Sequence, residues 1–242
     1  MKKTIVITGA SRGIGKAIAI ELAGKGTNIV INCVNNVDKL NEVKSIIEEK
    51  GSVCETFIGD MGNYSDVQKM FDMCLQRFGQ VDVLINNAGI SVVGLFQDMG
   101  EDEWHRICNT NIDSVFNCCH FAVKDMMKRH CGKIINISSV WGLYGASCEV
   151  AYSATKGAVN SFTKALAKEL APSGIQVNAV ACGAIDTEMN GHLSDDDKAS
   201  LAEEIPAGRF GSPQEVAKLV KSLSGMNSYL TGQIITLDGG WI

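Results

Sequence analysis

Tyr152 and Lys156 are the two residues of this sequence whose types and spacing point most directly to chemistry. They open a helix-patterned run, Gly157 to Leu170, and their four-residue spacing places both side chains on one face of a helix. A phenol is a weak acid at neutral pH, and a neighbouring ammonium group favours its ionised form and lowers its pKa. The pair is therefore a candidate proton donor to a carbonyl group that is being reduced. The alternative is two exposed helical side chains with no chemical role.

A glycine-rich turn near the start of the chain predicts a dinucleotide site. The β-branched run 4–8 is typical of a buried strand, and it leads through the spacing Gly-x3-Gly-x-Gly into a helical pattern. Glycine lets the backbone approach phosphate groups, and the start of a helix offers unpaired N–H groups. A merely tight strand-to-helix turn is the competing interpretation. The residues of this turn expected to contact the cofactor are Gly9, Ser11, Arg12, Gly13, Ile14 and Gly15.

The second predicted strand, 28–34, lacks the acidic residue that would hydrogen-bond a ribose 2′-hydroxyl. Val34 and Asn35, which are also expected to contact the cofactor, stand at its end instead. Arg12 could meet a 2′-phosphate from within the glycine loop. The sequence therefore favours NADP(H) over NAD(H), with a solvated Arg12 and NAD(H) as the alternative.

Strands and helices alternate along the chain with short connections, which is typical of βαβ units and a parallel sheet covered on both faces. No linker-like stretch interrupts the pattern, so one domain is expected over 1–242. A polar, Asp-rich stretch within 188–210 is predicted to be a mobile lid. The other predicted strands are 53–58, 81–85, 133–138, 175–181 and 232–237, and the predicted helices are 39–50, 65–78, 157–170, 213–223 and a long region, 101–129, divided near Asn111.

Several residues at the ends of the predicted strands complete the candidate cofactor site. Carboxyl ends of parallel strands meet at one edge of the sheet, where a ligand crevice forms. An adenine contact is expected at Asp60, and close backbone approach is expected after the fourth strand. The residues concerned are Asp60, Met61, Asn87, Ala88, Gly89, Ile185 and Thr187.

Composition excludes several classes of protein. The formal net charge of -5 gives no basic surface for nucleic acid. No apolar run is long enough to be a transmembrane helix, and the start of the chain lacks the apolar segment of a signal peptide. Nine cysteines without a regular framework indicate free thiols in a reducing cytoplasm.

The motifs together resemble the short-chain dehydrogenase/reductase family from end to end. The matching features are Thr8 to Gly15, Asn86 to Gly89, Asn111, Ser139 and Tyr152-x3-Lys156. Within that family the chain is most similar to the 3-oxoacyl-(acyl-carrier-protein) reductases of bacterial fatty-acid synthesis. The resemblance implies a Rossmann-type α/β fold, with a doubly wound parallel sheet of seven strands in the order 3-2-1-4-5-6-7. It also implies NADPH-dependent reduction of a ketone to a secondary alcohol, and a homotetramer.

The resemblance assigns roles to individual residues. Tyr152 would be the general acid, and its pKa would be lowered by Lys156 and by the positive nicotinamide. Lys156 would also hydrogen-bond the nicotinamide ribose, and Asn111 would anchor a water of a proton relay. Ser139 rather than Ser138 lies thirteen residues before the tyrosine and would hold the substrate oxygen. The residues expected to contact substrate are Ser139, Trp141, Tyr144, Tyr152, Gly183 and Met189, and no metal is expected.

Two features depart from the family pattern. Cys182 stands where the family usually carries proline, and it is interpreted as a small apolar filler in preference to a redox group. The basic residue that often meets an acyl carrier protein is absent, although Lys128, Arg129 and His130 form a basic cluster near the expected docking side. A solvated helix end explains that cluster equally well. Another alcohol–ketone pair (hydroxysteroid, sugar or small ketone) and a catalytically silent cofactor-binding subunit are the alternative functions.

Overall fold

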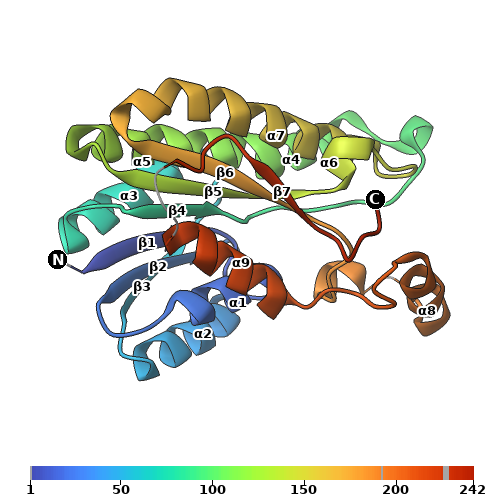
Figure 1. The fold of residues 1–242 in the computed structure, drawn as a ribbon, viewed down its shortest axis with the longest axis horizontal. Coiled ribbons are helices and arrows are strands. Elements are labelled where there is room, and N and C mark those ends of the chain that lie inside the picture. The colour runs from blue at the N-terminus through green and yellow to red at the C-terminus, as the bar shows by residue number, and fades with distance from the viewer. Residues whose placement is uncertain (1, 192, 226–228) are drawn as a thin grey trace.

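The computed structural model describes residues 2–191, 193–225 and 229–242. Its seven strands form one parallel sheet in the order β3-β2-β1-β4-β5-β6-β7 (Figure 1). This confirms the predicted strands and their order. The strands are β1 (Lys3–Ile7), β2 (Thr27–Cys33), β3 (Val53–Ile58), β4 (Val83–Asn86), β5 (Gly132–Ser139), β6 (Ile175–Cys182) and β7 (Ile234–Leu237).

Both faces of the sheet are covered, because successive strand residues point to opposite sides. Ile5 and Ile7 of β1 pack into one buried cluster, whereas Val6 packs into the other. The first cluster lies beneath α1 (Gly13–Leu22), α2 (Val37–Glu49) and α9 (Pro213–Gly225). The second lies beneath α3 (Tyr64–Phe78), α5 (Ser114–Arg129) and α7 (Val150–Leu170), and Figure 1 shows α4 (Glu101–Cys108) on this side too.

The predicted division of the long helical region near Asn111 is confirmed. A π-helical turn, Asn109–Asp113, separates α4 from α5. Such widened turns interrupt the regular backbone ladder and often occur at functional sites.

Two short helices were not predicted. One is α6 (Trp141–Tyr144), which follows β5, and the other is α8 (Asp195–Glu204), which stands away from the sheet in Figure 1. A capping box between Ser194 and Asp197 starts α8, but none of its residues is buried. The sequence therefore carries no apolar periodicity there that could indicate a helix.

Strand order reverses beside β1, since the chain runs outward to β3 and then places β4 on the other side of β1. In open parallel sheets, ligands bind outside the carboxyl ends of the strands at this reversal. The glycine loop and the ends of β4 and β5 meet there.

Within the described parts of the chain, no helix has the length and apolar character needed to cross a bilayer.

Candidate active site

Asn87, just beyond β4, holds the glycine loop in place. Its Nδ2 donates hydrogen bonds to the carbonyl oxygens of Thr8 (3.0 Å) and Gly9 (2.9 Å). The backbone N–H groups of Asn87 and Ala88 both donate to Thr8 Oγ1 at 3.0 Å. Gly9 has φ 63°, and a Cβ there would lie 2.9 Å from the Cα of Ala88. Only glycine permits this approach of the two loops.

The start of α1 fits the pyrophosphate of a dinucleotide. Arg12 is the N-cap, its side chain makes no capping hydrogen bond, and no acidic residue lies in the first turn. The first N–H groups of the helix therefore remain available for an anion. Gly13 (φ 55°) has no side chain to cover the backbone, and a Cβ added to it would contact Thr187, which lies in the segment after β6. Ser11 and Gly15 are buried in the same turn, and Ile14 packs against the core.

Two predicted cofactor contacts, Met61 and Ile185, have side chains that lie in the core rather than in the crevice. Met61 is 2% exposed and Ile185 is 5% exposed, and each packs into one of the two core clusters, so their cofactor contacts stay predictions. Both are apolar residues at strand ends, where burial stabilises the fold. The neighbouring Asp60 accepts a hydrogen bond from the backbone N–H of Gly62 (2.8 Å). Val34, by contrast, is exposed beyond the end of β2.

Tyr152, Lys156 and Ser139 come together at the carboxyl end of the sheet. Ser139 is the last residue of β5, and its hydroxyl lies beside the phenol of Tyr152 near the start of α7. Lys156 lies one turn further along α7, with Nζ 5.6 Å from the centre of the Tyr152 ring and 2.8 Å from the carbonyl oxygen of Ile137. Ser138 instead donates a hydrogen bond to the carbonyl oxygen of Lys156 (3.4 Å). Helix α7 therefore positions both Tyr152 and Lys156 at the carboxyl end of the sheet, near Ser139.

The predicted direction of the Tyr152 pKa shift is wrong for the protein without ligand. Burial raises the pKa of the phenol above its ordinary value, and the hydrogen bond from Ser139 offsets only part of that rise. Removing water disfavours the charged form of any acid. The same burial lowers the pKa of Lys156 to about 8, and Cys182 opposes this slightly. At neutral pH Lys156 is therefore still mainly protonated, and Tyr152 keeps its proton.

Asn111 positions other parts of the site. It is fully buried in the π-helical turn, where its Oδ1 accepts from the N–H of Ile90 (2.8 Å). Its Nδ2 donates to the carbonyl oxygen of Ile90 (2.8 Å) and to Thr155 Oγ1 (3.1 Å). The amide thus ties the Gly89–Ile90 segment to α7. A Cβ on Gly89 would lie 3.4 Å from both Asn111 Oδ1 and Lys156 Nζ, so glycine keeps this approach open.

Cys182, at the end of β6, is buried beside the catalytic candidates. It pairs with Ser139 across the sheet, and burial raises the pKa of its thiol to about 12. A thiol with so high a pKa is a poor nucleophile, because the thiolate is the reactive form. The geometry therefore agrees with the interpretation of Cys182 as an apolar filler.

Trp241, which the sequence patterns did not single out, packs against the predicted substrate contact Trp141. Its ring lies 4.9 Å from that of Trp141, at an interplanar angle of 63°. The C-terminal segment reaches this point because Gly183 allows close contact: a Cβ there would lie 2.7 Å from the Cα of Asp238. No local motif marks a residue that is brought in by the return of the chain after β7.

The start of the predicted lid is tied to the cofactor side of the molecule. Thr187 precedes a 3-10 turn, Glu188–Asn190, and Glu188 forms ion pairs with Arg12 and Lys39. Met189 and Tyr144 are exposed, at 46% and 63%. They lie on the lid and on α6, so their substrate contacts stay predictions.

The basic cluster at the end of α5 lies beside the segment that follows α7, since a Cβ on Gly174 would be 2.8 Å from the carbonyl oxygen of His130. Arg129 is held by Asp82 (3.0 Å) and Asp125 (2.8 Å), and it also donates to the carbonyl oxygen of Val81, just before β4. This lies at the amino ends of the strands, opposite Tyr152. Two carboxylates therefore neutralise Arg129, and docking of a carrier protein beside this cluster stays a prediction.

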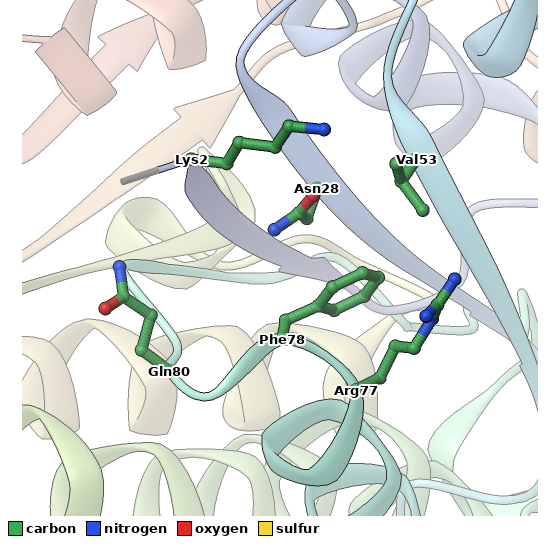
Figure 2. Close-up of a pocket in the computed structure, with 6 residues that line it drawn as sticks. All are labelled: Lys2, Asn28, Val53, Arg77, Phe78 and Gln80. Carbon is green, nitrogen blue, oxygen red and sulfur yellow. The ribbon is translucent and has the colours of Figure 1, made fainter.

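A pocket at the same far edge contains none of the candidate residues (Figure 2). It lies at the amino ends of β1 to β3, and the residues that line it are Lys2, Asn28, Val53, Arg77, Phe78 and Gln80. Arg77 is already paired with Glu55 and contacts the ring of Phe78.

A second pocket lies between α1, α9 and Asp186 to Glu188, beside the glycine loop. Among the residues described, no group of His, Cys, Asp and Glu could hold a metal ion.

Comparisons with known proteins agree with this arrangement. A profile described as short chain dehydrogenase matches residues 3–198. The chain is 41% identical over 241 residues to the 3-oxoacyl-(acyl-carrier-protein) reductase FabG of Staphylococcus epidermidis, covering 99% of each chain. It is 40% identical to the protein of the same name from Staphylococcus aureus, and the match covers 99% of this chain and 98% of that protein. It is 37% identical to the protein of that name from Chlamydia trachomatis, and the match covers 99% of this chain and 97% of that protein. A glycine loop at the sheet reversal, a Ser–Tyr–Lys set beside it and full-length similarity all lead to one conclusion: the chain belongs to the short-chain dehydrogenase family.

Proposed function

We propose that this protein reduces 3-oxoacyl groups on acyl carrier protein to 3-hydroxyacyl groups, using NADPH, as a step of fatty-acid synthesis. The observation that carries the proposal is the Ser139 hydroxyl beside the Tyr152 phenol, with Lys156 one helical turn away, at the crevice that the glycine loop borders. The names of relatives that match almost the whole chain supply the substrate class. Membership of the family implies a nicotinamide cofactor.

In this proposal Tyr152 gives its proton to the carbonyl oxygen of the substrate, while the Ser139 hydroxyl donates a hydrogen bond to the same oxygen. A buried, protonated phenol suits this role because it offers its proton only to a group that gains negative charge. When bound, the nicotinamide supplies the hydride to the carbonyl carbon. Lys156, fixed by the carbonyl oxygen of Ile137, would hold the ribose beside Tyr152 and supply positive charge. Orientation by these fixed groups is the chain's own contribution to the rate.

The preference for NADPH is part of the proposal. No acidic residue follows β2 to hydrogen-bond a ribose 2′-hydroxyl, and the Arg12 guanidinium lies at the neighbouring glycine loop. The residues that would hold the cofactor are Gly9, Ser11, Arg12, Gly13, Ile14, Gly15, Val34, Asn35, Asp60, Asn87, Ala88, Gly89, Tyr152, Lys156 and Thr187, with the main chains of Met61 and Ile185.

A turnover screen tests the substrate class. Acetoacetyl groups carried by acyl carrier protein and by coenzyme A would be compared with steroid, sugar and simple ketones, each with NADPH and with NADH. The carrier-bound thioester with NADPH is expected to give the highest kcat/KM, and nucleotide oxidation without ketone is the blank. If a steroid or sugar ketone is reduced best, the substrate assignment fails while the family membership stands.

A homotetramer is the second part of the proposal. Phe116 of α5 and Tyr64 of α3 are exposed large apolar side chains, and both ring systems lie within 6 Å of His120. Contiguous exposed apolar groups mark surfaces that bind other chains. Light scattering is expected to give the mass of four chains, and Phe116→Asp is expected to shift the protein to smaller species. Val37→Asp, on the other side of the sheet, is the matched control. A monomeric wild type would refute this part.

A further inference from the structure

Glu188, at the start of the lid, joins two cations from separate parts of the cofactor side of the molecule. Its Oε2 lies 2.8 Å from a terminal nitrogen of Arg12, and its Oε1 lies 2.9 Å from Lys39 Nζ. Arg12 belongs to the glycine loop and Lys39 to the first turn of α2. One carboxylate therefore ties the lid to both segments.

The arrangement is unusual within this molecule. Among the ion pairs of the residues described, Glu188 is the one acid that two cations share. The two hydrogen bonds from Lys39 and Arg12 lower the pKa of Glu188, so it is ionised at neutral pH. The three side chains remain half exposed, and a dissolved ligand can therefore reach them.

The two cations flank the carboxyl end of β2, the part of a dinucleotide crevice where the adenosine ribose is recognised. A site for a free 2′-hydroxyl needs an acceptor from the protein, whereas this one presents an ammonium and a guanidinium group. Two positive donors make an anion site, and the first acid after the strand is Asp38, which lies in the first turn of α2 rather than at the strand end. In the structure the anion is the carboxylate of Glu188.

We propose that Glu188 is an internal competitor for the 2′-phosphate of the cofactor, and that Lys39 acts with Arg12 as the second cation selecting phosphorylated nucleotides. The inference rests on the proposed use of a nicotinamide dinucleotide. A phosphate monoester carries more charge and more acceptor oxygens than a carboxylate, so it displaces Glu188 from both cations. A nucleotide without the phosphate leaves Glu188 in place.

Glu188 therefore sets how strongly the protein distinguishes NADPH from NADH. Its competition weakens binding of 2′-phosphorylated nucleotides and leaves the others unaffected. Displacement also releases the start of the lid from α2 and from the glycine loop. Binding of the phosphorylated cofactor is thereby coupled to the freedom of the segment that borders the substrate side.

The test is a set of binding titrations on the full chain with NADPH, NADH, adenosine 2′,5′-bisphosphate and AMP. In Glu188→Gln, the two 2′-phosphorylated ligands are expected to bind about three- to tenfold more tightly, the scale for losing exposed ion pairs. Binding of NADH and AMP is expected to stay unchanged. Glu203→Gln on α8 removes the same charge from another part of the lid and is the matched control. Lys39→Met is expected to weaken binding of the phosphorylated pair about tenfold and to spare NADH and AMP.

Each outcome decides a separate point. Equal changes for phosphorylated and unphosphorylated ligands, or no change in Glu188→Gln, would overturn the competitor role and leave the proposed function intact. The competitor role is also overturned if the Glu203→Gln control tightens NADPH binding as much as Glu188→Gln does. If the wild type binds none of the four ligands, the proposed function fails and this inference fails with it.

Discussion

Tyr152→Phe is expected to lower kcat for ketone reduction by at least about 100-fold, while NADPH still binds. The substitution keeps the aromatic ring near the start of α7 and removes only the hydroxyl that hydrogen-bonds Ser139. Without that hydroxyl, no acidic proton is offered to the carbonyl oxygen as negative charge develops on it. Steady-state rates with an acetoacetyl thioester, together with fluorescence titration of NADPH, measure the two effects separately.

The matched control for this variant is Tyr64→Phe, which removes a hydroxyl from an exposed tyrosine of α3 that is not among the candidate site residues. It is expected to leave kcat within about twofold of the wild type. Near-normal turnover in Tyr152→Phe would contradict the assignment of Tyr152 as the general acid. A loss of NADPH binding as large as the loss of turnover would show instead that the residue serves cofactor binding.

Lys156→Met is expected to lower kcat/KM by at least about 100-fold, because the variant loses both the ribose contact and the positive charge beside Tyr152. The same variant is expected to be as stable as the wild type or more stable at pH 7. Burial lowers the pKa of Lys156 from 10.5 to about 8, which corresponds to a cost on the order of 3 kcal/mol for the buried charge. The lost hydrogen bond to the carbonyl oxygen of Ile137 offsets part of this gain.

The pH dependence gives a second test of the same residue. Below pH 8 the folded and unfolded chains both carry the proton on Lys156, so the folded state bears the full cost of the charge. Between about pH 8 and 10.5 the folded chain loses this proton first, and the contribution of Lys156 to stability rises with pH. Urea unfolding at several pH values should show this rise in the wild type and in Lys164→Met, a control at an exposed lysine of the same helix. A wild-type profile that matches that of Lys156→Met would contradict the buried charge.

The sequence was sufficient for the fold because its signals are local. Alternating β-branched runs and amphipathic runs specify strands and helices, and the short connections specify parallel βαβ units. The division near Asn111 was also predicted, and the π-helical turn Asn109–Asp113 stands there. The helix that was not predicted in the lid, α8, starts with a capping box and buries none of its residues, so it presents no apolar face to the core that a sequence pattern could reveal.

The sequence by itself determined which residues meet at the carboxyl edge of the sheet. Spacing on one helix unites Tyr152 with Lys156, and the strand order brings Ser139 and the glycine loop beside them. Only the tertiary structure decided their electrostatics, because pKa values depend on how much water the packed neighbours exclude. It reversed the predicted shift of Tyr152, turned Met61 and Ile185 into the core, and neutralised Arg129 with Asp82 and Asp125. Contacts across long separations, such as Trp241 with Trp141 and Glu188 with Arg12, likewise arise only when distant segments of the chain pack together.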